Sequence, residues 1–229
     1  MKLLLFDIDG TLIRSNSAGR LAMAAALEEM FGTSGPLESY HMGGKTDARI
    51  ITDLLTAVGI PAAEIEEKLP AAYELMAVKA REIYPGREIM PCPGIEGLLA
   101  YLQGREDILV GLLTGNSRST TPLKLLAANI DPEQFPIGAY GSDHLDRNRL
   151  PSIAMRRAYE LTGIQFTGDN TVVIGDTPAD ILCARAGKAT AIGVASGWHS
   201  AETLSRYHPD YLFEDLADMP AVKQAILGE

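Results

Sequence analysis

Residues 1–12 read MKLLLFDIDGTL, a short apolar run from Leu3 to Ile8 that is interrupted by Asp7 and followed by Asp9. Short, nearly continuous apolar runs are typical of strands that are buried on both faces, as in a parallel sheet. The stretch therefore predicts a buried strand that carries two carboxylates at its carboxyl end.

Two later apolar runs end in a similar way, with small and polar residues that lead into a helical pattern. Residues 108–113 are followed by TGN (114–116), and residues 171–174 are followed by GDT (175–177). A proline stands at the start of each helical pattern, where its missing N–H is tolerated. These runs predict two further strands whose polar ends resemble the first.

The order of strands and helices predicts the fold class. Residues 189–194 are another strand candidate and residues 135–140 a weaker one. Strands that alternate with helices favour an α/β fold with a Rossmann-like parallel sheet. In such open sheets, ligands bind beyond the carboxyl ends of the strands.

A long segment without convincing strands follows the first strand. Within it, apolar residues recur at helical spacing, as at Ile50 and Leu54, and Pro70 is expected to break or kink one helix. Because a strand-to-strand crossover needs far fewer residues, we expect an inserted all-helical domain. The predicted domains are an α/β core, residues 1–14 and 91–229, and a helical domain, residues 15–90.

Four carboxylates follow these strand ends: Asp7, Asp9, Asp176 and Asp180. Gathered at one edge of a sheet, they would repel one another and take up protons unless a cation were bound. Hard divalent cations prefer oxygen ligands, and magnesium commonly partners phosphate groups. The charge pattern therefore predicts a site for Mg²⁺ and a phosphate.

The same motifs resemble those of the haloacid dehalogenase superfamily over nearly the whole chain, in order and in spacing. DIDGTL (7–12) looks like its first motif, DxDGT, and LTGN (113–116) looks like its second, a Thr or Ser after an apolar strand. GDTPAD (175–180) looks like the fourth motif, GDxxxD. The resemblance implies a phosphoric monoester hydrolase with a helical cap, similar to phosphoglycolate phosphatases.

The resemblance also implies a role for each residue. Asp7 would attack phosphorus and form an aspartyl-phosphate, while Asp9 would protonate the leaving alkoxide and then deprotonate the hydrolytic water. The Asp7 carboxylate, the Asp9 backbone carbonyl and Asp176 would bind magnesium, with Asp180 acting from an outer position or through water. The second motif would hold the phosphoryl oxygens through Thr114, Gly115 and Asn116.

The third motif of the family usually supplies a lysine before a helix that starts with a proline, and this sequence departs from that pattern. Residues 146–151 read DRNRLP, without a lysine. An arginine must then supply the charge, and from either position it is a good phosphate or carboxylate partner. We favour Arg147 over Arg149 as the source of this charge. At least one of the two arginines must then be a solvated charge in the loop.

Residues 42–47, MGGKTD, stand out within the inserted domain, which resembles the caps that close over active sites in this superfamily. Gly44 would let the backbone approach the site, and Thr46 would cap the next helix. Lys45 either contacts the leaving group of the substrate or is a solvated lysine at a helix start. Farther along the chain, Trp198 is expected to pack against the protein interior.

Composition limits the partners. The net charge of −10 over 229 residues argues against a nucleic-acid surface, whereas a small phosphorylated metabolite needs positive charge only inside one cleft. No apolar run approaches the length of a membrane span, which needs about 20 residues. The two cysteines lack the spacing of a zinc site, which favours reduced thiols and a cytoplasmic location. The substrate and the oligomeric state stay open.

Several other functions remain as alternatives. A phosphomutase or a phosphonate hydrolase of the same superfamily would use the same core, with Lys45 as the candidate for an activated lysine in the latter. A dehalogenase is disfavoured, because Asp9 would be superfluous. A non-enzymatic, phospho-accepting domain like a response regulator would share the acidic residues, but it does not need the long insertion.

Overall fold

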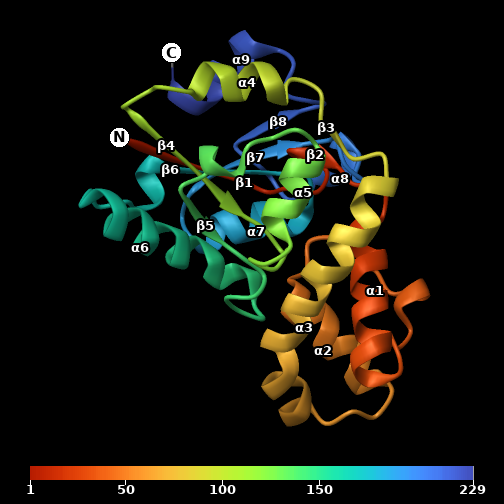
Figure 1. Ribbon diagram of the computed structural model, residues 1–229. Helices are drawn as coiled ribbons and strands as arrows, with labels where there is room; N and C mark the ends of the chain where they lie inside the picture. The colour runs from red at the N-terminus through yellow and green to blue at the C-terminus, as the bar shows by residue number, and fades with distance from the viewer. Residues whose placement is uncertain (229) are drawn as a thin grey trace.

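The computed structural model describes residues 1–228 and contains a sheet of six strands in the order β5-β4-β1-β6-β7-β8 (Figure 1). All neighbouring strands in it are parallel. The strands are β1 (Lys2–Phe6), β4 (Ile108–Leu113), β5 (Ile137–Ala139), β6 (Thr171–Gly175), β7 (Thr190–Val194) and β8 (Tyr211–Phe213). The predicted α/β fold with a Rossmann-like parallel sheet is confirmed, and β8 is a strand that the sequence pattern did not reveal.

Helices cover both faces of the sheet, which explains why β1 is apolar from Leu3 to Phe6. Leu4 and Phe6 contribute to one core, and Leu3 and Leu5 contribute to the other, since side chains alternate across a strand. The first core is covered by α4 (Ile95–Leu102), α5 (Thr121–Ala127) and α9 (Met219–Leu227). The second is covered by α6 (Leu150–Thr162), α7 (Pro178–Ala186) and α8 (Ala201–Ser205).

The inserted helices form a separate bundle beside the sheet (Figure 1). They are α1 (Ala18–Phe31), α2 (Asp47–Ala57) and α3 (Ala62–Ile83), and they share a core of their own that includes Leu27, Leu54 and Met76. A short antiparallel pair, β2 (Ile13–Arg14) and β3 (Met90–Pro91), lies where the chain leaves and re-enters the sheet domain. The division of the chain at residues 14/15 and 90/91 stays a prediction, which the position of this pair supports.

Short 3₁₀ turns lie in the connections: η1 (Leu37–Ser39), η2 (Tyr84–Gly86), η3 (Pro132–Gln134), η4 (Arg147–Arg149) and η5 (Gly168–Asn170). Within residues 1–228, no helix combines the length and the apolar character that a bilayer crossing requires.

Two expectations about single residues are wrong, one of them in part. Helix α3 does not break at Pro70, which is exposed, because Ile65 on one side and Tyr73 on the other are anchored in the core of the bundle; a kink at Pro70 stays a prediction. Trp198 is 91% exposed rather than packed. The loop after β7 runs so close to Asp176 that a Cβ on Gly197 would lie 1.8 Å from its Oδ2, and this path carries Trp198 outward.

Candidate functional site

The turn after β1 brings the first and fourth motifs together. Within it, the carbonyl of Ile8 accepts hydrogen bonds from the backbone N–H groups of Leu12 and Ile13, and Gly10 has a φ of +87°. A Cβ on Gly10 would lie 2.3 Å from Oδ2 of Asp176, so this position requires glycine both for its conformation and for the close approach. The tight turn thereby places Asp176 beside the end of β1.

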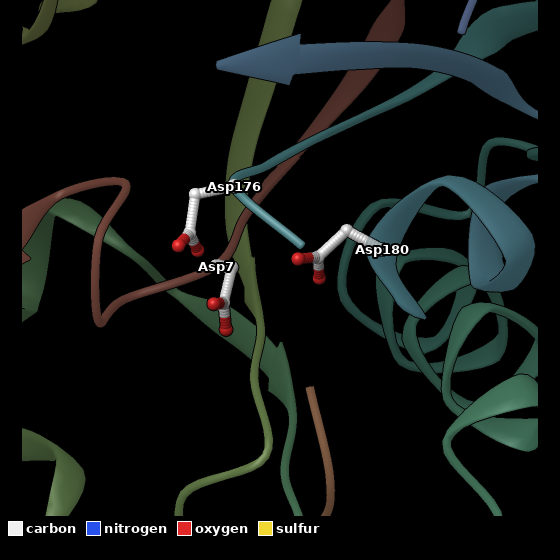
Figure 2. Close-up of side chains that lie close together, drawn as sticks. All are labelled: Asp7, Asp176 and Asp180. Carbon is white, nitrogen blue, oxygen red and sulfur yellow. The ribbon is translucent and has the colours of Figure 1, made fainter. Parts of the chain in front are cut away.

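Three carboxylates converge at this edge of the sheet, as Figure 2 shows. Asp7, Asp176 and Asp180 each offer an oxygen, and these oxygens lie within 4.8 Å of one another. Asp180 is fixed by a capping box at the start of α7, in which its carboxylate accepts from the backbone N–H of Thr177. All three aspartates are buried, with exposed fractions of 6%, 1% and 2%.

Charge repulsion within the cluster changes the proton affinity of its members. Burial raises the pKa of Asp7 to about 7, with Asp180 adding to the effect and Arg147 opposing it. Burial also raises the pKa of Asp176 well above its ordinary value, and the nearby carboxylates Asp180 and Asp7 raise it further. The cluster consequently needs protons or a cation, and its buried oxygen donors fit a hard divalent cation.

Arg147 is the arginine that contacts this cluster. Its Nη2 lies 3.0 Å from Oδ1 of Asp7 and 2.5 Å from Oδ1 of Asp180. Burial opposes the charge of Arg147, but Asp180 and Asp7 together raise its pKa. Its Nε is buried without a hydrogen-bond acceptor. Arg149 is exposed, so of the two arginines it is Arg147 that contacts the cluster, and its role as the third-motif charge stays a prediction.

The side chain of Asp9 takes part in a different network. Its Oδ1 accepts from Oγ of Ser15 at 2.5 Å, and its Oδ2 accepts from Nδ2 of Asn116 at 2.8 Å and from Nζ of Lys124 at 2.6 Å. Asn116 also donates to Oγ1 of Thr114 at 2.8 Å. Desolvation works against ionisation of Asp9, but Lys124 and the hydrogen bonds lower its pKa below the ordinary value.

The loop that precedes α2 covers the cluster. Gly44 has a φ of +73°, and a Cβ there would lie 2.5 Å from the Cβ of Ala179, so the predicted close approach of this glycine is present. The Lys45 carbonyl oxygen lies only 2.1 Å from where a Cβ of Gly115 would be. Thr46 caps α2 as expected, because its Oγ1 accepts from the backbone N–H of Arg49 at 3.2 Å.

Asp47 ties the inserted helices to the second motif. Its backbone N–H donates to the carbonyl of Gly115 at 2.7 Å, and its carboxylate accepts from the backbone N–H of Ser117 at 2.7 Å. Burial raises the pKa of Asp47 to about 6, while Lys124 opposes the rise. The loop that should hold phosphoryl oxygens is therefore in direct contact with the helical domain.

A cavity of about 700 Å³ lies between the two parts of the chain, and its lining includes residues of both. From the core these include Asp7, Asp9, Arg147 and Asp176. Lys45 lines the cavity from the other side, where its Nζ lies 3.9 Å from the centroid of the Tyr40 ring. The cavity has room for a small metabolite next to the carboxylates.

Comparison with known proteins gives the family. The family model for haloacid dehalogenase-like hydrolases matches residues 1–188. The chain belongs to this family. A phosphoglycolate phosphatase of Mannheimia succiniciproducens is 26% identical over 237 residues, which cover 95% of this chain and 96% of that protein. Pyrophosphatase PpaX of Listeria welshimeri is 25% identical over 225 residues, which cover 96% of this chain and 94% of that protein.

Solved structures agree on the fold of this haloacid dehalogenase-like hydrolase. A mutant of CbbY from Rhodobacter sphaeroides, in complex with xylulose-(1,5)bisphosphate, matches it with a TM-score of 0.70. The identity is 20%, and the match covers 95% of this chain and 96% of the other.

The structure brings the residues predicted from the family motifs to one edge of the sheet. Three residues near them were missed: Ser15, Asp47 and Lys124. The sequence pattern could have pointed to Lys124. This lysine lies three residues after Thr121 and one before Leu125, so it shares the buried face of α5 with both of them. Ser15 had no such signal, since only the turn after β1 directs it toward Asp9.

The raised pKa of Asp7 predicts a pH dependence of stability in the metal-free hydrolase. A carboxyl group whose pKa rises from 3.8 unfolded to about 7 folded binds more protons in the folded state between these values, so its contribution to stability falls as pH rises through this range. We expect the free energy of unfolding of the wild type, relative to Asp7→Asn, to fall by on the order of a few kcal/mol between pH 4 and pH 8.

Urea unfolding of both proteins in the presence of a chelator measures this difference. A constant difference across the range would show that Asp7 is not held at a raised pKa.

Proposed function

We propose that this hydrolase is a magnesium-dependent phosphatase that cleaves a small phosphorylated metabolite through an aspartyl-phosphate on Asp7. The observation that carries the proposal is the position of Asp7: it follows the central strand, faces two further carboxylates and contacts Arg147 at 3.0 Å. Asp9, two residues farther on, is held in a separate network beside it. The phosphatases among its relatives support this reaction type.

The buried carboxylates fit a magnesium ion. Asp7 and Asp176 would hold it together with the backbone carbonyl of Asp9, and Asp180 would support it from an outer position. The side chain of Asp9 lies in the other network, which is consistent with a contribution from its carbonyl alone. Bound Mg²⁺ would neutralise charge on the carboxylates and on the phosphoryl group.

The remaining groups divide the work of binding and proton transfer. Arg147 would neutralise Asp7 and the phosphoryl group. Thr114 and the amides of Gly115 and Asn116 would hold phosphoryl oxygens. Asp9 would give a proton to the leaving oxygen and later take one from the attacking water.

The cap loop would select the leaving group. Gly44 brings the loop against the core, and Lys45 projects into the cavity near the Tyr40 ring. Relatives named for phosphoglycolate and pyrophosphate, and a structural neighbour that holds a sugar bisphosphate, make small anionic phosphates the first class to screen. A phosphomutase or a phosphonate hydrolase remains the alternative within the family. A cytoplasmic location and the absence of nucleic-acid partners stay predictions.

The nucleophile is tested by Asp7→Asn. An amide of the same shape keeps the packing of the cluster but cannot form the aspartyl-phosphate, so we expect turnover of p-nitrophenyl phosphate to fall by several orders of magnitude. The thermal unfolding temperature confirms that the variant is folded. Activity comparable to that of the wild type would contradict the mechanism.

The metal site is tested by Asp176→Ala. We expect activity to collapse at ordinary magnesium and to recover in part at much higher concentrations, because one ligand is lost. In the absence of metal, the variant should unfold at a higher temperature than the wild type, since one buried carboxyl group is removed from the repelling cluster. Magnesium at a hundredfold excess over its Kd should stabilise the wild type by about 2.7 kcal/mol and the variant by less. An unchanged magnesium dependence would remove Asp176 from the metal site.

The third-motif arginine and the cap lysine should differ in their effects on two kinds of substrate. Arg147→Ala should lower kcat/KM for every phosphate ester alike, because it acts on the transferred group. Lys45→Ala should spare p-nitrophenyl phosphate and lower kcat/KM for the best substrate of a metabolite panel, because it acts on the leaving group.

Arg149→Ala serves as the matched control, since Arg149 is exposed. A uniform loss in Arg149→Ala would reverse the assignment of the arginines, and a neutral Lys45→Ala would mean a solvated lysine. Loss of carbon–phosphorus cleavage in Lys45→Ala, where the wild type performs it, would identify a phosphonate hydrolase instead.

A further inference from the structure

Lys124 is a buried cation that lies outside the carboxylate cluster. Its side chain is 5% exposed, whereas 37% of the Asp9 side chain is exposed. The Nζ of Lys124 lies 2.6 Å from Oδ2 of Asp9 and 2.6 Å from Oδ1 of Asn116. Lys124 therefore supports Asp9 from the protein side and leaves part of its carboxylate open to the cavity.

Two helices hold Lys124 in place. It belongs to α5, the first helix after the second motif, which buries Thr121, Lys124 and Leu125. Helix α1 closes over it at Gly19, where a Cβ would lie 2.8 Å from Nζ and 3.0 Å from Cε of Lys124. The ammonium group thus lies between the sheet domain and the inserted helices, with little freedom to move.

Stability alone is a weak reason for such a lysine. Removing an ammonium and a carboxylate from water costs several kcal/mol per ion, and a buried pair is often no more stabilising than apolar residues of the same size.

The hydrogen bonds of the network fix the orientation of the Asp9 carboxylate. Asn116 donates to Asp9 through Nδ2 and accepts from Lys124 through Oδ1. Together with Ser15, this arrangement fixes both oxygens of the Asp9 carboxylate.

We propose that Lys124 is a positioning residue that orients the Asp9 carboxylate for the hydrolysis of the aspartyl-phosphate. The proposal rests on the function proposed above. It adds a residue that none of the four family motifs contains, and it assigns that residue to one half of the reaction.

In this half-reaction, the oxygen of a water molecule forms a bond to phosphorus, and the bond between phosphorus and the Asp7 oxygen breaks. The electron pair of the broken bond returns to Asp7 as a carboxylate, and one proton of the water passes to the Asp9 carboxylate. Hydrogen phosphate leaves, and Asp9 keeps the proton that the leaving group takes in the next turnover. An Asp9 that is poorly oriented would delay this step and let the aspartyl-phosphate accumulate.

p-Nitrophenyl phosphate separates the two half-reactions, because nitrophenolate is a good leaving group that needs no proton. For this ester, kcat/KM reports the steps up to the release of nitrophenolate, and kcat includes the hydrolysis of the aspartyl-phosphate. Loss of Lys124 should therefore lower kcat and KM together and produce a burst of nitrophenolate, a result that general damage to the fold would not give.

Gly19→Ala displaces the lysine without removing it. The added methyl group must push Nζ away from its position, whereas alanine suits the interior of α1 better than glycine does. Gly97→Ala is the matched control, because Gly97 lies within α4 and a Cβ there meets no atom within 4 Å. Lys124→Met, which removes the charge, serves as the second variant.

Stopped-flow measurements with saturating p-nitrophenyl phosphate and magnesium provide the test. General acid–base catalysis contributes about 10²–10⁴-fold, so we expect Gly19→Ala and Lys124→Met to lower kcat at least about tenfold after a burst of nearly one nitrophenolate per enzyme. Gly97→Ala should match the wild type. In an Asp9→Asn background, Lys124→Met should cause no further loss, because it acts through Asp9.

Each contrary result has a distinct meaning. If Gly19→Ala matches Gly97→Ala, or if kcat/KM falls without a burst, the role of Lys124 in this step is overturned while the proposed function stands. Multiplicative losses in the double variant overturn it as well. If the wild type releases no nitrophenolate, or if Asp7→Asn remains active, the proposed function fails and the inference fails with it.

Discussion

The repulsion among the buried carboxylates Asp7, Asp176 and Asp180 is the constraint on which the rest of the structure depends. Their oxygens lie within 4.8 Å of one another, at the end of a sheet whose interior is apolar on both faces. Arg147 offsets part of the charge through contacts to Asp7 and Asp180. The turn at Gly10 and the capping box of α7 hold the carboxylates together despite their repulsion. The buried oxygen donors fit a hard divalent cation, and such a cation would relieve the repulsion.

Two aspartates that are separated by one residue occupy opposite electrostatic environments. Burial among carboxylates raises the pKa of Asp7 to about 7, whereas Lys124, Ser15 and Asn116 lower the pKa of Asp9 despite its partial desolvation. Pairs of carboxyl groups whose environments separate their pKa values often divide catalytic roles between them. Here the carboxylate cluster surrounds Asp7, and a network that includes Lys124 supports Asp9. The separation arises from different elements, since α7 carries Asp180 and α5 carries Lys124.

The inserted helices complete the site rather than merely cover it. Asp47 of α2 contacts the second motif through both its backbone and its carboxylate, and Gly19 of α1 lies against Lys124. A movement of these helices would change the surroundings of Asn116 and Asp9 as well as the volume of the cavity. Under the proposed function, substrate selection by the cap and proton transfer in the core would therefore share the same contacts.

The sequence by itself determined the parallel α/β core and three members of the carboxylate cluster, whereas the side chain of Asp9, which was expected among them, lies in another network. Both depend on local patterns: apolar runs of strand length, and polar motifs directly after them, whose meeting at one edge follows from parallel strand order alone. The same locality explains the failures, since Pro70 is kept within α3, and Trp198 is carried into solvent, by contacts distant in the chain. Only the tertiary structure brings Arg147, and not the exposed Arg149, against the carboxylate cluster, and only it joins Lys124 to Asp9 across 115 residues. The reason is that the sequence gives the charge of each side chain directly. The partner with which that side chain pairs depends on how helices that are far apart in the sequence pack around the end of the sheet.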